Sequence, residues 1–304
     1  MGIPDFLQSF LKSNNFVLKE IVQISKWKKT FVLKVSKEDK DYILKAISDI
    51  SPARIKSKFT TEVNVYLENS NDYVPNLVFN TDAIIITDYI KGRTLRDYLI
   101  EGMSIHEIME NLILGIKTIY NENKREHSES NSFGNAYANI SSLAQSGPIQ
   151  TKDLSILDKV INKTIAFVLR LKLKKALSKL NYKNLKSGFA HGDFHYNNIF
   201  VTPNNEIKFI DFENVAYNEY FDFDILYLLV MIEAKLGRTE KSKVNYKEIE
   251  GLINDDANFK PIYSLYRTAA SVNPRFSREP LKANQKWLLL LKLILFKNAA
   301  IANN

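Results

Sequence analysis

The chain has 304 residues, of which 45% are hydrophobic and 12% aromatic; this is enough for a large buried core and excludes a disordered chain. It contains no cysteine, so disulfides, thiol nucleophiles and thiolate zinc sites are excluded together. The net charge of +8 comes from an excess of Lys and Arg that is unevenly spread along the sequence.

The first 90 residues have the pattern of a small antiparallel sheet with two helices. Apolar runs predict five strands, at 16–25, 30–38, 41–48, 76–80 and 83–90. Helices are expected over 3–13 and 54–69. One face of the second helix is apolar and is formed by Phe59, Val63, Tyr66 and Leu67. Successive hairpins indicate antiparallel pairing, so we expect a compact unit that ends near Ile90.

Beyond this unit the pattern changes to long helices, which indicates a second lobe. Helices are expected over 104–123, over 151–181 and, in several pieces, between 222 and 300. The polar stretch 121–137 predicts a loop. The sequence therefore predicts an α+β fold, with a small β-rich lobe at 1–90 and a larger helical lobe at 91–304.

Much of the positive charge lies in one segment. Residues 151–190 hold ten Lys or Arg and two Asp, in a pattern of apolar and basic residues that predicts a helix with a cationic face. This pattern favours a solvated face, and the alternative is a surface that contacts an anionic substrate, a glycolipid or an anionic membrane. Nucleic acid is the least favoured partner, because no aromatic stacking positions are interleaved with the lysines.

The longest apolar run, at 287–296, is interrupted by Lys292 and falls short of the ~20 residues that span a bilayer. It predicts a buried helix, with an interfacial membrane helix as the alternative. The N-terminus lacks the basic and apolar pattern of a signal peptide. We therefore expect a cytoplasmic protein.

The stretch HGDFHYNN at 191–198, followed by IDFE at 210–213, gathers carboxylates and amides. Two short apolar strands joined by the turn sequence TPNN predict a hairpin that brings Asn198 near Asp211. Asp193 lies five residues before Asn198, in a loop. We expect the three polar side chains to converge.

One carboxamide and two carboxylates form the oxygen-rich kind of site that Mg²⁺ prefers when it also binds substrate phosphates. With Asn198 and Asp211 as metal ligands, Asp193 is free to orient an attacking hydroxyl and accept its proton. The residues therefore predict phosphoryl transfer.

These motifs resemble the H-G-D-x-x-x-x-N and I-D-[FW]-E motifs of the aminoglycoside phosphotransferase and choline kinase superfamily, which is related to protein kinases. The resemblance implies a bilobal protein-kinase-like fold, ATP as phosphate donor and Mg²⁺ as metal. It implies Asp193 as the catalytic base and Asn198 and Asp211 as metal ligands. It assigns His191 and His195 to packing and loop ordering.

Outside these motifs the resemblance is carried by single positions. In such kinases a Lys on the third strand contacts the nucleotide phosphates and pairs with a helix Glu, and Lys45 and Glu62 match these positions. Adenine is expected to hydrogen-bond to the backbone of Asp88, Tyr89 and Ile90.

A further family position is an Asp that begins a helix after the metal ligand. Asp224 matches it best and is expected to be a buried acceptor that holds the catalytic loop, while Asp222 is expected to cap the helix.

The loop SKWKKT at 25–30 departs from protein kinases, because it contains no glycine that could close over the phosphates. Lys26, Lys28 or Lys29 are candidates to supply side-chain charge there, and the alternative is that they are solvated lysines. GTP in place of ATP stays open.

A helix is expected shortly after Asp211, which leaves no room for the peptide platform of a protein kinase. This favours transfer to a hydroxyl of a small molecule: a sugar, a sugar-containing antibiotic, an amino alcohol or a glycolipid sugar. Acceptor-binding residues are expected in the helical lobe, including the loop at 124–150. The alternatives are a noncatalytic nucleotide-binding regulatory protein of kinase fold and a kinase that acts on a macromolecule.

Overall fold

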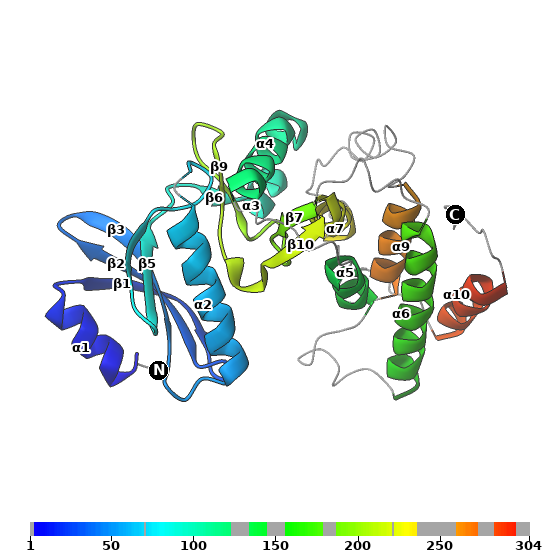
Figure 1. Ribbon diagram of the computed structural model, residues 1–304, viewed down its shortest axis with the longest axis horizontal. Helices are drawn as coiled ribbons and strands as arrows, with labels where there is room; N and C mark the ends of the chain where they lie inside the picture. Colours follow the sequence, from blue (N-terminus) through cyan, green and yellow to red (C-terminus); the bar gives the residue numbers. More distant parts are fainter. Residues whose placement is uncertain are drawn as a thin grey trace.

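The protein is an α+β chain with a β-rich N-terminal lobe and a helical C-terminal lobe (Figure 1). The computed structural model describes residues 3–69, 71–122, 134–144, 156–178, 187–220, 222–235, 260–272 and 283–295. The fold class predicted from the sequence is confirmed.

The N-terminal lobe is one antiparallel sheet of five strands with the order β1-β2-β3-β5-β4. Its elements are α1 (Asp5–Ser13), β1 (Val17–Ser25), β2 (Thr30–Lys37), β3 (Lys40–Ile47), α2 (Ala53–Glu68), β4 (Leu77–Asn80) and β5 (Ile84–Asp88). All seven agree with the predicted elements to within a few residues, because each has a clear apolar period.

The two helices of this lobe cover opposite faces of the sheet (Figure 1). Helix α1 buries Leu7 and Leu11 against side chains that include Leu44 and Ala46 of β3. Successive strand residues point to opposite faces, so Lys45, between these two, points to the side of α2. The alternation of side chains along β3 therefore places Lys45 on the face of the sheet that α2 and the helical lobe contact.

One predicted detail of α2 is wrong. Phe59, Val63 and Tyr66 are buried, but Leu67 is 60% exposed. At 100° per residue, Leu67 lies just beyond the edge of the buried arc, on the side that turns to solvent.

The second lobe begins with a short three-stranded sheet and two helices. These are β6 (Arg93–Thr94), α3 (Leu95–Ile100), α4 (His106–Glu122), β8 (Ile199–Val201) and β9 (Ile207–Phe209), with the strand order β6-β8-β9. A second pair, β7 (Ser187–Ala190) and β10 (Ala216–Tyr220), is antiparallel and frames the catalytic-loop motif and the IDFE motif. The predicted hairpin is present as β8 and β9, while β6, β7, β10 and α3 were not predicted.

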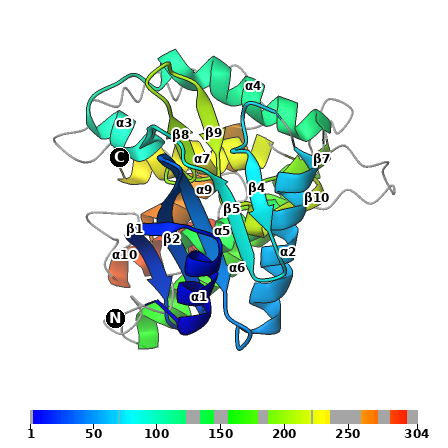
Figure 2. The ribbon, with the colours of Figure 1, turned by 90° about the vertical axis from the view of Figure 1, so that its left-hand side faces the viewer.

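The remaining helices form a bundle behind these strands (Figure 2). They are α5 (Gly134–Ala144), α6 (Ile156–Leu177), α7 (Asp222–Lys235), α9 (Lys260–Ser271) and α10 (Ala283–Leu295). Helix α5 overlaps the end of the predicted loop at 121–137, whose part at 123–133 lies outside the described residues, as does most of the loop at 124–150. The ends of the predicted basic helix, at 151–155 and 179–181, also lie outside them.

Helices α6 and α10, which contain most of the basic segment and of the longest apolar run of the sequence, are only half buried. On α10, Leu289, Leu290 and Leu293 face the core, whereas Trp287 and Leu291 are about half exposed, at 46% and 50%. Helix α6 also exposes apolar side chains between its basic residues. Among the helices in the described ranges, none is both long and apolar enough to cross a membrane.

We expect Leu44→Ala to lower the free energy of unfolding by about 2–5 kcal/mol, because Leu44 is fully buried between the sheet and α1. Leu67→Ala is the matched control and should change it by less than about 0.5 kcal/mol, since Leu67 is exposed. Urea unfolding followed by circular dichroism measures both. Equal effects of the two substitutions would contradict the assignment of the two positions.

Candidate active site

The site is organised around the ammonium group of Lys45. Its Nζ lies 2.5 Å from Glu62 Oε2 on α2 and 2.7 Å from Asp211 Oδ1, in the segment after β9. The side chain of Lys45 is 18% exposed and that of Glu62 2%, so these charges are largely removed from water. Buried charges require close partners of opposite sign, and Lys45 has two.

The pKa values of these groups reflect burial and pairing together. Burial alone would lower the pKa of Lys45, but the carboxylates of Glu62 and Asp211 outweigh it and hold that pKa well above 10.5. Burial raises the pKa of Glu62 to about 7, although Lys45 acts in the opposite direction. Burial would also raise the pKa of Asp211, but Lys45 outweighs it and keeps the pKa below 3.8. Asp211 is therefore ionised at neutral pH, as a metal ligand must be.

A second carboxylate, that of Glu213, forms ion pairs with lysines of the N-terminal lobe. Its Oε1 lies 3.2 Å from Nζ of Lys28, in the turn between β1 and β2, and 3.5 Å from Nζ of Lys58 on α2. Its Oε2 lies 3.7 Å from Lys45. Glu213 and Lys58 were not singled out from the sequence, although Glu213 is part of the IDFE motif and Lys58 lies one helical turn before Glu62.

Asp211 has an unusual backbone conformation, with a φ of +63°, in the left-handed region. Asp is one of the few residues other than Gly that enter this region with some frequency. The turn leads into the short 3-10 helix Phe212–Asn214, which places Asp211 and Glu213 toward the same group of lysines.

The backbone of Asn198 is tied to the strand that leads to Asp211, because the N–H of Ile210 donates to the Asn198 carbonyl at 3.0 Å. The side-chain Nδ2 of Asn198 donates to the carbonyl of Asp193, also at 3.0 Å. This leaves the carboxamide Oδ1 as an acceptor for a further ligand. The predicted proximity of Asn198 to the region of Asp211 is thus present in the hydrogen bonding of the hairpin.

The carboxylate of Asp193 lies in the loop between β7 and β8, and its side chain is 36% exposed, so it is accessible from solvent. His195 stands beside it, with Nε2 3.8 Å from Asp193 Oδ1. The other ring nitrogen, Nδ1, accepts a hydrogen bond from the N–H of Asn197 at 3.1 Å. His195 therefore orders the loop, as expected, and also faces the carboxylate of Asp193.

Gly192 is required by the shape of this loop. Its φ is +75°, and a Cβ at this position would lie 2.0 Å from the backbone oxygen of Asn214. Any other residue would clash with the segment that carries Asp211 and Glu213. The backbone of Gly192, in the first motif, therefore packs directly against that of Asn214, the residue that follows the IDFE motif.

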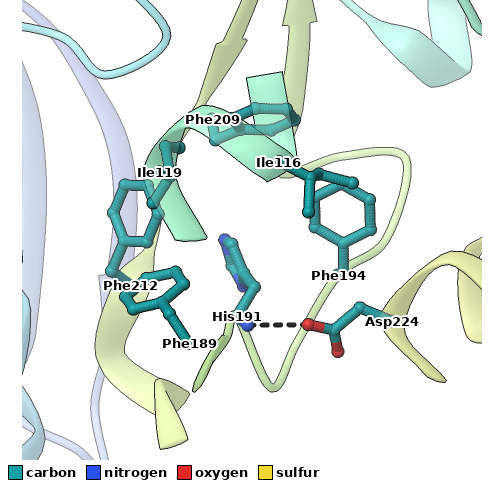
Figure 3. A pocket seen from close by; sticks show the side chains of 8 residues that line it. All are labelled: Ile116, Ile119, Phe189, His191, Phe194, Phe209, Phe212 and Asp224. Carbon is teal, nitrogen blue, oxygen red and sulfur yellow. Dashed lines mark hydrogen bonds between the residues drawn. The ribbon is translucent and has the colours of Figure 1, made fainter. Parts of the chain in front are cut away.

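His191 lies behind the loop in an apolar enclosure and is 4% exposed (Figure 3). The enclosure is a small cavity lined by Ile116, Ile119, Phe189, His191, Phe194, Phe209, Phe212 and Asp224. The His191 ring packs on Phe212 and Phe194, and its Nε2 lies 3.0 Å from the carbonyl of Ile210. Burial lowers the pKa of His191 below 6.5. The ring thus holds the chain just before Asp211, in the packing role that the resemblance implies.

Asp224 anchors the loop from α7. Its carboxylate is 2% exposed and accepts the backbone N–H of His191 at 2.7 Å (Figure 3). The prediction that Asp224 is a buried acceptor is confirmed, and it holds the loop at 191–198. Helix α7 begins at Asp222, whose side chain lies outside the described part.

The segment after β5 uses part of its backbone within the lobe. The N–H of Asp88 donates to Asn76 at 3.0 Å, and that of Tyr89 donates to Asp41 at 3.3 Å. In the described part of the chain no hydrogen bond to the N–H of Ile90 is found. Of the three residues expected to contact adenine, Ile90 is therefore the one whose backbone N–H is available to donate a hydrogen bond to a ligand.

Within the described ranges, no three His, Cys, Asp or Glu side chains form a cluster that could hold a metal by themselves. A site of one ionised carboxylate, Asp211, and one carboxamide oxygen, of Asn198, is therefore incomplete without further oxygen ligands. This donor set fits Mg²⁺ bound together with phosphate oxygens and does not fit zinc.

No protein-family model matches the sequence, and no curated protein matches it. Solved structures do. An apo thermostable mutant of aminoglycoside phosphotransferase APH(4)-Ia has a TM-score of 0.53 at 12% identity, covering 94% of this chain and 91% of its own. Spectinomycin phosphotransferase APH(9)-Ia, in complex with ADP and spectinomycin, has a TM-score of 0.50 at 14% identity, covering 97% and 94%. An ethanolamine kinase from Plasmodium vivax has a TM-score of 0.50 at 15% identity, covering 96% and 85%.

At these identities the likeness establishes the fold. The chain shares the bilobal fold of these solved structures over nearly its whole length, with a β-rich N-terminal lobe followed by a helical lobe. The resemblance inferred from the two motifs is thus confirmed for the fold.

The burial of His191 predicts how stability depends on pH. Because its pKa is lowered in the folded protein, His191 contributes stability that is complete above pH 6.5 and is lost as the pH falls below it. We therefore expect the unfolding free energy of the wild type to fall between pH 6.5 and 5 more steeply than that of His191→Phe. Urea unfolding at a series of pH values measures this, and parallel curves for the two proteins would contradict a neutral, buried His191.

Proposed function

We propose that this chain, which has the fold of the aminoglycoside phosphotransferase and choline kinase superfamily, transfers the γ-phosphate of ATP to a hydroxyl group of a small molecule. The observation that carries the proposal is the ammonium of Lys45 held between Glu62 and Asp211, with the neighbouring Ile210 hydrogen-bonded to Asn198 at the end of the loop that carries Asp193. This arrangement supports the proposal, because phosphoryl transfer needs a cation for the phosphates, a metal ligand and a base, and Lys45, Asp211 and Asp193 are the candidates for these roles.

In this proposal the lobe at 1–90 binds the nucleotide and the lobe at 91–304 carries the catalytic loop and the acceptor site. The N–H of Ile90 and the carbonyls of Asp88 and Ile90 are the groups that hydrogen-bond adenine, with GTP as the alternative nucleotide. The ring of Tyr89 packs over the Nζ of Lys34, which lies 3.9 Å from the ring centroid. This contact holds the chain in place where it leaves β5.

Asn198 and Asp211 hold Mg²⁺, which neutralises the phosphates of the nucleotide when it is bound. Lys45 stabilises the same phosphates, and Glu62 keeps the ammonium of Lys45 pointing at them. Asp193 orients the acceptor hydroxyl and accepts its proton as the phosphoryl group is transferred. Most of the catalytic effect comes from placement and from fixed charge.

The acceptor is a small molecule. Residues after Asp211 pass directly through the 3-10 helix and β10 into α7, without a segment that could serve as a platform for a peptide. Solved structures with this fold act on acceptors such as spectinomycin and ethanolamine, according to their names. The use of ATP agrees with a cytoplasmic location, and contact with a membrane or glycolipid stays a prediction.

The test is release of ADP by the purified protein with ATP and Mg²⁺, screened against sugars, aminoglycosides, amino alcohols and glycolipid sugars. With the true acceptor, Asp193→Asn should lower the rate by about 10²- to 10⁴-fold, the usual contribution of a general base. Asp82→Asn is the matched control, since Asp82 is exposed in the turn between β4 and β5, and it should leave the rate unchanged.

The competing explanation is a nucleotide-binding protein without catalytic activity. It would be supported if the wild type binds ATP normally but no acceptor raises ADP release above the level of Asp193→Asn. A rate that rises only with a protein acceptor would instead indicate a kinase that acts on a macromolecule.

A further inference from the structure

The turn between β1 and β2 lies where protein kinases cover the phosphates with glycines, yet it carries three lysines and no glycine. The three have different environments. The backbone of Lys29 is structural, with a φ of +54° and a carbonyl that accepts hydrogen bonds from Ser48 and Ser51. Lys26 is exposed and forms no ion pair with the described residues. Lys28 alone of the three reaches across to the other lobe, where its Nζ lies 3.2 Å from Glu213.

Lys58 reaches the same carboxylate from α2. Its Nζ lies 3.5 Å from Glu213 Oε1 and also donates to the side-chain oxygen of Asn214. Lys58 and Glu62 are four residues apart on the helix, so they lie on one face of it, one turn from each other. Lys45, held by Glu62, is 3.7 Å from the other oxygen of Glu213.

Three ammonium groups from three separate elements of the N-terminal lobe therefore surround one carboxylate, which is 13% exposed. Lys28 and Lys58 share a single oxygen atom at distances longer than the 2.7–2.9 Å of a strong charge-assisted hydrogen bond. Both side chains keep partial access to solvent, 32% for Lys28 and 23% for Lys58. Neither lysine has a short, exclusive ion pair with Glu213, and the further partner of Lys58, the side-chain oxygen of Asn214, is uncharged, so phosphate oxygens can take the place of Glu213 at both.

We propose that Lys28 and Lys58 bind the terminal phosphates of the nucleoside triphosphate, and that Glu213 occupies them while no nucleotide is bound. The inference rests on the proposed function and names a further part of its nucleotide site. Phosphate oxygens offer several acceptors and more negative charge than one carboxylate, so they can satisfy both ammonium groups at once. Side-chain charge then replaces the backbone N–H groups that a glycine-rich loop supplies.

Binding measurements with nucleotides of different phosphate number test this. The affinities of ATP, ADP and AMP are measured by calorimetry for the wild type, Lys28→Ala, Lys58→Ala and the control Lys26→Ala, each with and without Mg²⁺. We expect Lys28→Ala and Lys58→Ala to weaken ATP binding about tenfold or more, the size expected when a hydrogen bond to a charged group is lost. AMP binding should change by less than about twofold, and Lys26→Ala should bind all three like the wild type.

Two further variants separate charge from folding. Lys28→Arg keeps the cation and should retain ATP affinity within about threefold, whereas a general disturbance of the turn would weaken it as much as Lys28→Ala does. Glu213→Gln removes the competing anion, so in the absence of metal it should bind ATP more tightly than the wild type. Thermal unfolding of each variant verifies that it is folded.

The inference is overturned if Lys28→Ala and Lys58→Ala bind ATP as the wild type does, or if they weaken AMP as much as ATP. The proposed function can fail separately, since a wild type that binds ATP through these lysines but phosphorylates no acceptor would retain the lysine site and lose the enzyme. A wild type that binds neither ATP nor GTP would overturn both.

Discussion

The structure depends on the burial of one positive charge. The ammonium of Lys45 is removed from most of the solvent and can remain charged only because Glu62 and Asp211 lie within 2.7 Å of it. Glu62 comes from α2 and Asp211 from the segment after β9, so the requirement for partners brings a strand, a helix and the second lobe to one point. Within the described residues, every ion pair that joins the sheet lobe to the helical lobe ends on Asp211 or Glu213.

The site is therefore assembled from segments that are far apart in the sequence, and the charged groups bring them together. The loop at 191–198 is held on one side by the buried side chains of Asp224 and His191, while the side toward the N-terminal lobe carries the ion pairs of Asp211 and Glu213 with lysines. Preorganised groups stabilise developing charge without having to reorient during the reaction.

Local patterns were sufficient to predict the elements of the N-terminal lobe, because β2, β3 and α2 have strong periods. Two short apolar runs and the turn sequence TPNN were sufficient to predict the hairpin of β8 and β9. The pairs β6–β8 and β7–β10 were missed because strands of two to five residues have no period of their own and exist only through partners far along the chain. The contact of Lys28 with Glu213 joins residues 185 positions apart, and nothing in the turn SKWKKT distinguishes Lys28 from its neighbours. The predicted burial of Leu67 was wrong for a simpler reason, since helical periodicity locates an apolar face but not the edge of that face.

The close approach of Gly192 to Asn214 has a consequence for how the protein moves. Because backbone fills the space where a side chain would be, the catalytic loop cannot shift without displacing the segment that carries Asp211 and Glu213. Lys58 links that same segment to α2 through a hydrogen bond to the side chain of Asn214. Helix α2, the segment of Asp211 and Glu213 and the loop of Asp193 are therefore joined by consecutive contacts, and Lys45 pairs with the first two of these three elements.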